Sequence, residues 1–243
     1  MTRLNELLGP DTADQDAQSG EAPGTGRVTS AYQAIREAIR SNLFPPGYQA
    51  AEVEIARQLG MSRTPVHEAM ARLQEDGLVR ILPKKGILIR ALSAADIEEI
   101  YEVTIALEGA AAARIARLPA ELREPVTDTL RQATLAMRAA LSREDLKAWA
   151  LADEQFHETL VARCGNRRLT RMAGTVADQL HRARMFTLNL RPLPSASADE
   201  HFAIITSIEN GQTEEASRAA RRHRQHACDQ LLPLIAKLNL RNL

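Results

Sequence analysis

The segment from Glu52 to Gly77 constrains the fold more than any other part of the chain, because it holds two short helical patterns separated by a tight turn. Gly60 is suited to the left-handed position that ends the first helix. Ser62 is a favourable N-cap for the second helix, and Pro65 lies in its first turn, where a missing N–H has no cost. Two short helices joined by so few residues predict a helix-turn-helix motif.

The sequence on both sides of this motif predicts a larger unit. Apolar residues from Val28 to Leu43 recur at helical spacing until a Pro-Pro-Gly turn stops the helix. After the motif, apolar runs at 78–82 and 87–90 flank a Pro-Lys-Lys-Gly segment, which predicts a β-hairpin with a basic tip. Three helices followed by such a hairpin predict a winged helix-turn-helix domain over residues 27–91.

Long amphipathic patterns without a strand signal follow this domain. The aromatic content is only 3%, and Leu, Ala, Arg and Glu are abundant, which favours helix over sheet. Ser93 and Asp96 predict a capping box at the first helix, and Asn166 is expected to cap the fourth. We expect helices at 93–117, 120–141, 143–163, 167–187, 198–210 and 213–238. The predicted fold class is therefore mostly α, with a C-terminal all-α bundle of about six helices over residues 92–243.

The formal net charge of zero conceals segments of different charge. Residues 1–26 hold one Arg against five acidic residues, and their Asp, Gly, Pro, Thr and Ser content predicts a disordered acidic leader. Residues 27–90 hold ten Lys and Arg against six Asp and Glu, whereas residues 91–243 hold twenty of each. A basic segment beside a neutral body is typical of a polyanion-binding domain on a separate support.

Cysteine content and hydropathy exclude several classes of protein. Cys164 and Cys228 are the only cysteines, too few for a disulfide framework or a thiolate metal site. No apolar run approaches the ~20 residues of a membrane span, and the start of the chain lacks the apolar core of a signal peptide. We therefore expect a cytoplasmic protein without a membrane partner.

Polar residues gather at the N-terminal end of the second motif helix. In a helix-turn-helix this end enters the major groove of DNA, so base-reading and phosphate-binding groups are needed there. Arg63 can donate two hydrogen bonds to guanine O6 and N7, and His67 lies one turn later. Ser62 and Thr64 are better placed for phosphate oxygens. These residues predict binding to double-stranded DNA, against the alternative of a solvated face on a protein-interaction module.

The hairpin tip carries a second basic group. Lys84 and Lys85 suit the minor groove or the sugar-phosphate backbone beside the major-groove contacts. Gly86 would allow the backbone to approach the DNA closely. The predicted DNA-binding set therefore combines the helix end with this tip.

Four potential metal ligands are distributed over the predicted bundle. Asp153 and His157 are four residues apart, which places a carboxylate and an imidazole on one helical face. His223 follows His201 by 22 residues, a spacing that an antiparallel helix hairpin folds back to the same level. Oxygen and nitrogen ligands from several helices suit a divalent ion such as Zn, Ni or Mn. The spacing alone also fits a surface hydrogen-bonded pair.

Two other roles for such a metal remain open at this stage. An ion held by one Asp and three His can activate water, and Glu154 and Glu158 flank the cluster as candidate general bases, so a metal-dependent hydrolase is one alternative. A purely structural metal that stabilises the bundle is another.

The N-terminal motif resembles a known family. SRTPVHEAMARLQEDGLV, the Pro-Pro-Gly turn and the Lys-Lys-Gly wing are similar to the GntR family of bacterial winged-helix repressors. The resemblance implies a transcriptional regulator that acts as a repressor and binds a palindromic operator as a homodimer. The family most often carries Arg at the position of His67, so this departure implies a different operator preference or salt dependence.

The C-terminal segments resemble the FCD ligand-sensing domain of the FadR-like subgroup of that family. DEQFHETLVARCGNRRL contains its D-x3-H and Gly-Asn motif, and DEHFAIITSIENGQTEEASRAARRH is similar to its closing pair of helices. Asp153, His157, His201 and His223 stand at the motif positions, which implies a metal site. His226 has no motif counterpart and is expected to be a solvated neighbour.

The resemblance also implies an effector pocket for an organic acid or a related metabolite near the metal. IYEVTIALEGAAAARIA is similar to the first helix of the domain, but Thr104 stands where many members have an arginine. Arg182 and Arg184 could supply the missing positive charge from another helix. His181 is expected either in the pocket wall or on the bundle surface. Residues 92–243 would thus bind metal and effector and form the dimer.

Overall fold

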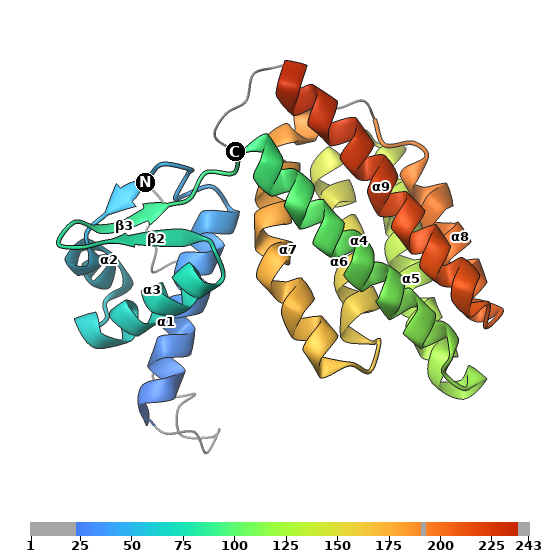
Figure 1. Cartoon of the computed structure of the whole chain (residues 1–243), viewed down its shortest axis with the longest axis horizontal. Coiled ribbons are helices and arrows are strands. Elements are labelled where there is room, and N and C mark those ends of the chain that lie inside the picture. The colour runs from blue at the N-terminus through green and yellow to red at the C-terminus, as the bar shows by residue number, and fades with distance from the viewer. Residues whose placement is uncertain (1–22, 191–192, 238–243) are drawn as a thin grey trace. The chain divides into compact units, whose positions relative to one another are not determined.

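The computed structural model describes residues 23–190 and 193–237, and the chain divides into two compact units between Leu92 and Ser93 (Figure 1). The predicted leader up to residue 22 lies outside the described residues. Helix α1 (Pro23–Arg40) already includes residues 23–26, which we had assigned to the leader. Proline is tolerated as the first residue of a helix, so α1 can begin at Pro23 although proline is also common in irregular segments.

The first unit contains the predicted helix-turn-helix. Helices α2 (Glu52–Leu59) and α3 (Arg63–Glu75) flank the turn, and Gly60 adopts a left-handed φ of 64° at the end of α2. The apolar faces of the helices and the sheet form one buried core. Its larger members are Ile35, Ile39, Ile55, Val66, Met70, Leu73, Ile87 and Ile89.

The predicted hairpin is present as β2 (Val79–Leu82) and β3 (Gly86–Ile89), which pair antiparallel. A two-residue strand, β1 (Gln49–Ala50), adds to the far side of β3, so the sheet order is β1-β3-β2. We did not predict β1 because two residues are too few for an alternating pattern. The first unit is therefore a winged helix-turn-helix.

The second unit is an all-α bundle, as predicted, and six α-helices occur among its described residues. They are α4 (Ala94–Ala116), α5 (Ala120–Leu141), α6 (Leu146–Ala162), α7 (Arg167–Thr187), α8 (Ser197–Glu209) and α9 (Thr213–Lys237). A short 3-10 turn, η3 (Leu188–Leu190), follows α7. Helices α4 and α9 pack along each other (Figure 1). The core includes Ile115, Leu130, Met137, Phe156, Leu160, Ile204 and Ile208.

Local capping fixes where several of these helices begin. Ser93 and Asp96 form the predicted capping box at α4, and the Asn166 side chain accepts hydrogen bonds from two backbone N–H groups at the start of α7. Helix α6 begins three residues later than predicted because Asp145 caps it. Within the described residues, no helix is both long and apolar enough to cross a membrane.

Candidate metal centre and nucleic-acid interface

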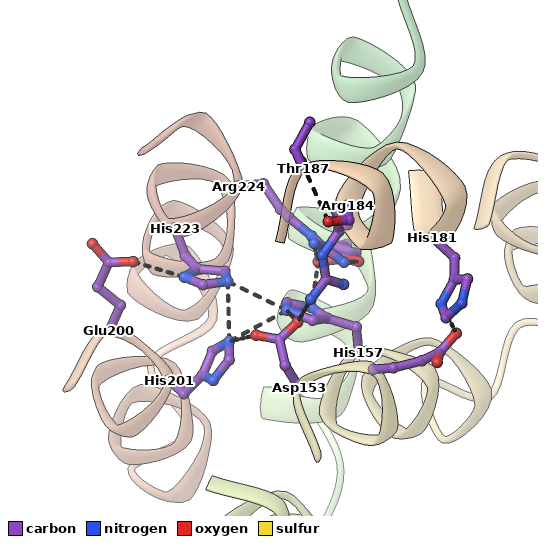
Figure 2. Close-up of polar contacts among 11 residues, drawn as sticks. Asp153, His157, His181, Arg184, Thr187, Glu200, His201, His223 and Arg224 are labelled. Carbon is purple, nitrogen blue, oxygen red and sulfur yellow. Dashed lines mark hydrogen bonds and ion pairs between the residues drawn. The ribbon is translucent and has the colours of Figure 1, made fainter. Parts of the chain in front are cut away.

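Three helices bring the four predicted metal ligands together inside the second unit. Asp153 and His157 project from α6, His201 from α8 and His223 from α9, and all four residues are buried. Their ligand atoms lie within 4.8 Å of one another. Figure 2 shows the three imidazole rings and the carboxylate meeting at one point.

The Nε2 atoms of the three histidines form a small triangle. His201 Nε2 lies 3.0 Å from His223 Nε2 and 3.3 Å from His157 Nε2, and the third side is also 3.3 Å. The Asp153 carboxylate lies 3.8 Å from two of these nitrogens. In zinc sites with Zn–N bonds of ~2.0–2.1 Å, tetrahedral ligand nitrogens are about 3.3–3.4 Å apart. The observed spacing fits ligands around one ion.

Two of these histidines have carboxylate partners on their outer nitrogens. The Nδ1 atom of His157 donates to Glu108 at 2.9 Å, and the Nδ1 atom of His223 donates to Glu200 at 2.7 Å. A carboxylate can only accept, so the proton of each neutral ring lies on Nδ1 and the Nε2 lone pair faces the cluster. Such carboxylate–histidine pairs orient ligands in metal sites.

The donor set supports a cation at the centre. With lone pairs on His157 and His223, at most one of the three converging Nε2 atoms can carry a hydrogen while the rings are neutral. The third ring, His201, stacks on Phe156 at a centroid distance of 4.0 Å, and its buried Nδ1 has no hydrogen-bond partner in the described part of the chain. Converging lone pairs repel one another unless a cation binds them, so these residues fit a divalent metal.

Burial and charge keep the cluster in its metal-binding protonation state. Burial lowers the pKa of His157 to about 4 and holds the pKa of His201 well below its ordinary value. Burial opposes ionisation of Asp153, but the Arg184 guanidinium together with the nearby histidines and Arg224 outweighs it and holds the pKa of this carboxyl far below its usual range. Neutral imidazoles beside an ionised carboxylate are the forms that coordinate metals.

A buried ion pair contacts His157 on the side of its ring that faces away from the cluster. Arg224 donates two hydrogen bonds to Glu108, at 2.6 and 2.8 Å, and the same carboxylate accepts from His157. Burial opposes ionisation of Glu108, yet Arg224 and His157 together hold the pKa of its carboxyl well below the usual range. The pair thus connects α4 and α9 to the cluster.

A cavity of about 120 Å³ opens beside the cluster. Its lining includes two of the ligands, Asp153 and His223, and the polar residues Trp149, Arg184, Ser197, Glu200 and Arg224. This volume is comparable to that of a cavity of about 150 Å³, which accommodates benzene. The space therefore suits a small molecule next to the candidate metal.

Of the three predicted pocket residues, Arg184 is in the lining of this cavity, whereas Thr104 and Arg182 are not. Arg184 also pairs with Asp153. The Thr104 hydroxyl donates to the backbone oxygen of Ile100 at 2.8 Å. Arg182 is buried on α7, and burial lowers its pKa to about 10 although Asp178 acts in the opposite direction. Arg182 and Arg184 are only two residues apart on α7, and residues at this spacing project from different faces of a helix.

The other candidate histidines lie outside the cluster. His181 Nδ1 lies 3.0 Å from Glu154, away from the convergence point (Figure 2). His226 is half-exposed and shares Glu200 with His223, at 2.7 Å in each contact. Of the two glutamates considered as general bases, Glu154 faces His181 and Glu158 is exposed.

The predicted DNA-binding residues of α3 are exposed on one end of that helix. Ser62, Arg63, Thr64 and His67 all lie in or before its first two turns. The Nδ1 atom of His67 lies 2.7 Å from the Glu52 carboxylate on α2, and Arg63 lies 4.0 Å from the same group. Glu52 therefore fixes the two donors relative to each other.

The wing tip presents exposed cations, and its glycine lies against the neighbouring strand β1. Lys84 and Lys85 are exposed in the turn between β2 and β3. Gly86 has a φ of 93°, and a Cβ atom there would lie 2.0 Å from the backbone oxygen of Ala50. The glycine is thus required by the close approach of β1, which is sufficient to explain it without DNA.

Several residues of the site escaped sequence reasoning. Glu108 hydrogen-bonds His157, and Glu200 hydrogen-bonds His223. In each pair the two residues are too far apart in sequence for local spacing to predict the contact. The position of Trp149 at the site could have been predicted, because Trp149, Asp153 and His157 are spaced by four residues and share one face of α6. Ser197 stands in the same relation to His201 on α8.

A winged helix-turn-helix with an exposed polar helix end, joined to a helical unit with a buried acid–histidine cluster, defines a class of two-domain transcriptional regulators. Models of known families agree with this class: that of the bacterial regulatory proteins of the gntR family matches residues 27–89, and that of the FCD domain matches residues 99–226. The chain belongs to the GntR family and carries an FCD domain.

Individual relatives support this assignment. An uncharacterised HTH-type transcriptional regulator in the TAR-I ttuE-ttuC' intergenic region of Agrobacterium vitis is 77% identical over 137 residues, which cover 56% of this chain and 80% of the relative. The HTH-type transcriptional repressor RspR of Escherichia coli is 26% identical over 80% of this chain and 84% of its own length.

Solved structures agree on the fold. The E. coli protein McbR/YncC superposes with a TM-score of 0.70 at 16% identity, covering 88% of this chain and 99% of the other. The relatives are transcriptional regulators and not enzymes, so the hydrolase alternative is set aside.

Proposed function

We propose that the chain is a repressor whose operator affinity is controlled by a small organic acid bound beside a divalent metal in the helical unit. The observation that supports this proposal most directly is that three histidine Nε2 atoms and one carboxylate lie within 4.8 Å of one another, with a cavity beside them. The repressor named among the relatives supports the direction of regulation.

Residues of the first unit would read the operator. Arg63 and His67 would contact base edges in the major groove, while Ser62 and Thr64 would bind phosphate. Lys84 and Lys85 at the wing would contact the flanking backbone or minor groove. As a homodimer, the protein would place two α3 helices on a palindromic site.

Residues of the second unit would hold the metal. Asp153, His157, His201 and His223 would be its ligands, and Zn, Ni or Mn all accept this set. A bound divalent ion supplies an electrophilic position for an anionic oxygen of the effector. Arg184, which pairs with Asp153 and lines the cavity, would add positive charge at the same end.

Band-shift titrations with DNA from the chain's own promoter test this function. We expect the wild-type protein to bind a discrete DNA segment and R63A to lose at least ~5-fold in affinity, because one bidentate base contact contributes about 1–3 kcal/mol. The matched control is Arg143→Ala, a residue of the helical unit for which no DNA contact is proposed. Equal affinity of R63A and wild type would contradict the DNA-reading assignment.

The effector arm uses the same titration with a panel of short organic acids and with a chelator. We expect at least one acid to change the operator affinity of the metal-loaded protein, and the change to disappear after chelation. Unchanged affinity across the panel would remove the ligand-responsive part of the proposal.

A purely structural metal is the second candidate. The ligands come from α6, α8 and α9, and Arg184 on α7 contacts one of them, so an ion at this point would stabilise four helices together. Chelation that lowers the melting temperature but leaves the acid response intact would favour this role.

A further inference from the structure

Two polar atoms in the cavity wall have no hydrogen-bond partner among the residues that the structure describes. Trp149 is 5% exposed, and neither its indole Nε1 nor the buried Oγ of Ser197 has a partner in the described part of the chain. Both residues line the cavity beside the cluster. A buried indole N–H normally finds an acceptor, and leaving one unpaired is costly. These atoms therefore indicate a missing hydrogen-bonding group.

The two residues occupy equivalent positions relative to the candidate metal ligands. Trp149 lies one helical turn before Asp153 on α6, and Ser197 lies one turn before His201 on α8. Four residues of helix rise about 6 Å. Both residues therefore start about 6 Å along their helices from a candidate ligand, a separation close to the span between the two terminal oxygens of an extended four-carbon hydroxy acid.

The charges in the cavity differ between its two ends. Arg184 pairs with Asp153 at the cluster, which makes this end suitable for a carboxylate. Glu200 also lines the cavity, and its two carboxylate oxygens lie 2.7 Å from His223 Nδ1 and His226 Nδ1. This anion disfavours a second carboxylate on the ligand. Trp149 and Ser197 are uncharged, so they suit a neutral oxygen.

We propose, on the basis of the function proposed above, that Trp149 and Ser197 select effectors. Their side chains hydrogen-bond a neutral hydroxyl or carbonyl oxygen at the end of the effector remote from its carboxylate. The indole N–H donates to this oxygen, and the serine hydroxyl donates to it or accepts from it. The effector class is then a short hydroxy- or oxo-acid of about four carbons. A site built to pair a hydroxyl rejects the analogue that lacks it.

Three four-carbon acids that differ only at the far end test the proposal. Butyrate ends in a methyl group, 4-hydroxybutyrate in a hydroxyl and succinate in a carboxylate. Calorimetric titration of the zinc-loaded full-length protein should give a Kd for 4-hydroxybutyrate at least ~5-fold lower than for either other acid, the smallest ratio expected for one unpaired buried group. Trp149 is the only tryptophan, so its emission should shift with the same acid.

Two variants assign the selectivity to these side chains. W149F keeps an aromatic ring but removes the N–H, and S197A removes the hydroxyl; each should reduce the selectivity ratio to below ~3 while zinc binding is retained. Ser142→Ala, in an exposed position at the end of α5, is the control and should keep the wild-type ratio. Because the two variants are independent, misfolding of one does not remove the test.

The outcomes separate this inference from the function on which it rests. Equal affinities for the three acids, an unchanged ratio in both folded variants, or zinc binding without binding of any of the three acids would overturn the inference and leave the metal site standing. Failure of the wild-type protein to bind zinc, nickel or manganese would overturn the proposed metal-dependent function itself.

Discussion

Replacing Glu108 with glutamine should strongly destabilise the helical unit. Both side chains of the Glu108–Arg224 pair are 5% exposed, so their charges are removed from water. Glutamine keeps the size of the side chain but removes its charge, which leaves the Arg224 guanidinium buried without a full counter-charge. Breaking a buried pair in this way costs about 3–5 kcal/mol, a large part of a typical stability of about 5–15 kcal/mol.

The same substitution should weaken metal binding. His157 donates its Nδ1 hydrogen to Glu108 at 2.9 Å, and this bond directs the Nε2 lone pair toward the other ligands. An amide oxygen is a weaker acceptor than a carboxylate, and the amide can also rotate to present its NH₂ group. Loss of such an outer partner reduces metal affinity about 10–100-fold.

Urea unfolding and zinc competition measure the two effects. The emission of Trp149, the only tryptophan, reports unfolding of the helical unit in the chelator-treated protein. The matched control is Glu99→Gln, an exposed residue on the same helix. The double variant E108Q/R224M removes the unpaired charge and should recover at least about 2 kcal/mol. A loss below about 1 kcal/mol in E108Q, with unchanged zinc affinity, would refute the reasoning.

Three further predictions follow from named contacts. Burial holds the pKa of His157 at about 4, below the ordinary value of about 6.5, so the unfolded state binds more protons between these values. The metal-free protein should therefore lose up to about 3 kcal/mol as the pH falls from about 6.5 to 4, and H157Q should flatten this part of a chemical-denaturation series across pH. H67R should change operator affinity and base preference in fluorescence anisotropy, since an arginine at this base-reading position can donate two hydrogen bonds to guanine; equal affinities of H67R and wild type across a set of operator variants would contradict the docking. Gly86→Ala should lower the melting temperature and operator affinity because its Cβ would meet the Ala50 backbone, whereas Gly174→Ala, with open space around it, should be tolerated; equal melting temperatures would disprove the close-approach argument.

Elements with strong local signals could be predicted from the sequence. The helices of both units follow apolar periodicity, and Gly60, Ser93 and Asn166 end or begin helices at the expected places. The proximity of Asp153, His157, His201 and His223 could also be predicted, because helical spacing and one antiparallel hairpin bring these residues to the same level.

The other contacts of the site depend on packing between residues far apart in sequence, which a local sequence pattern does not predict. Glu108 reaches His157 across 49 residues and Arg224 across 116. Thr104 and Arg182, two of the predicted pocket residues, do not line this cavity, because a position on a helix does not determine which neighbours a side chain contacts. The role of Gly86 depended on β1, whose two residues carry no strand pattern.

Metal content of the purified full-length protein tests the central claim most directly. After dialysis against zinc, nickel or manganese in separate samples, followed by removal of free ions, elemental analysis should find one ion per chain with at least one of these metals. The H157A variant should lose this ion because it removes one of three converging nitrogens. No stoichiometric uptake of any of the three metals, or equal uptake by H157A, would contradict the claim.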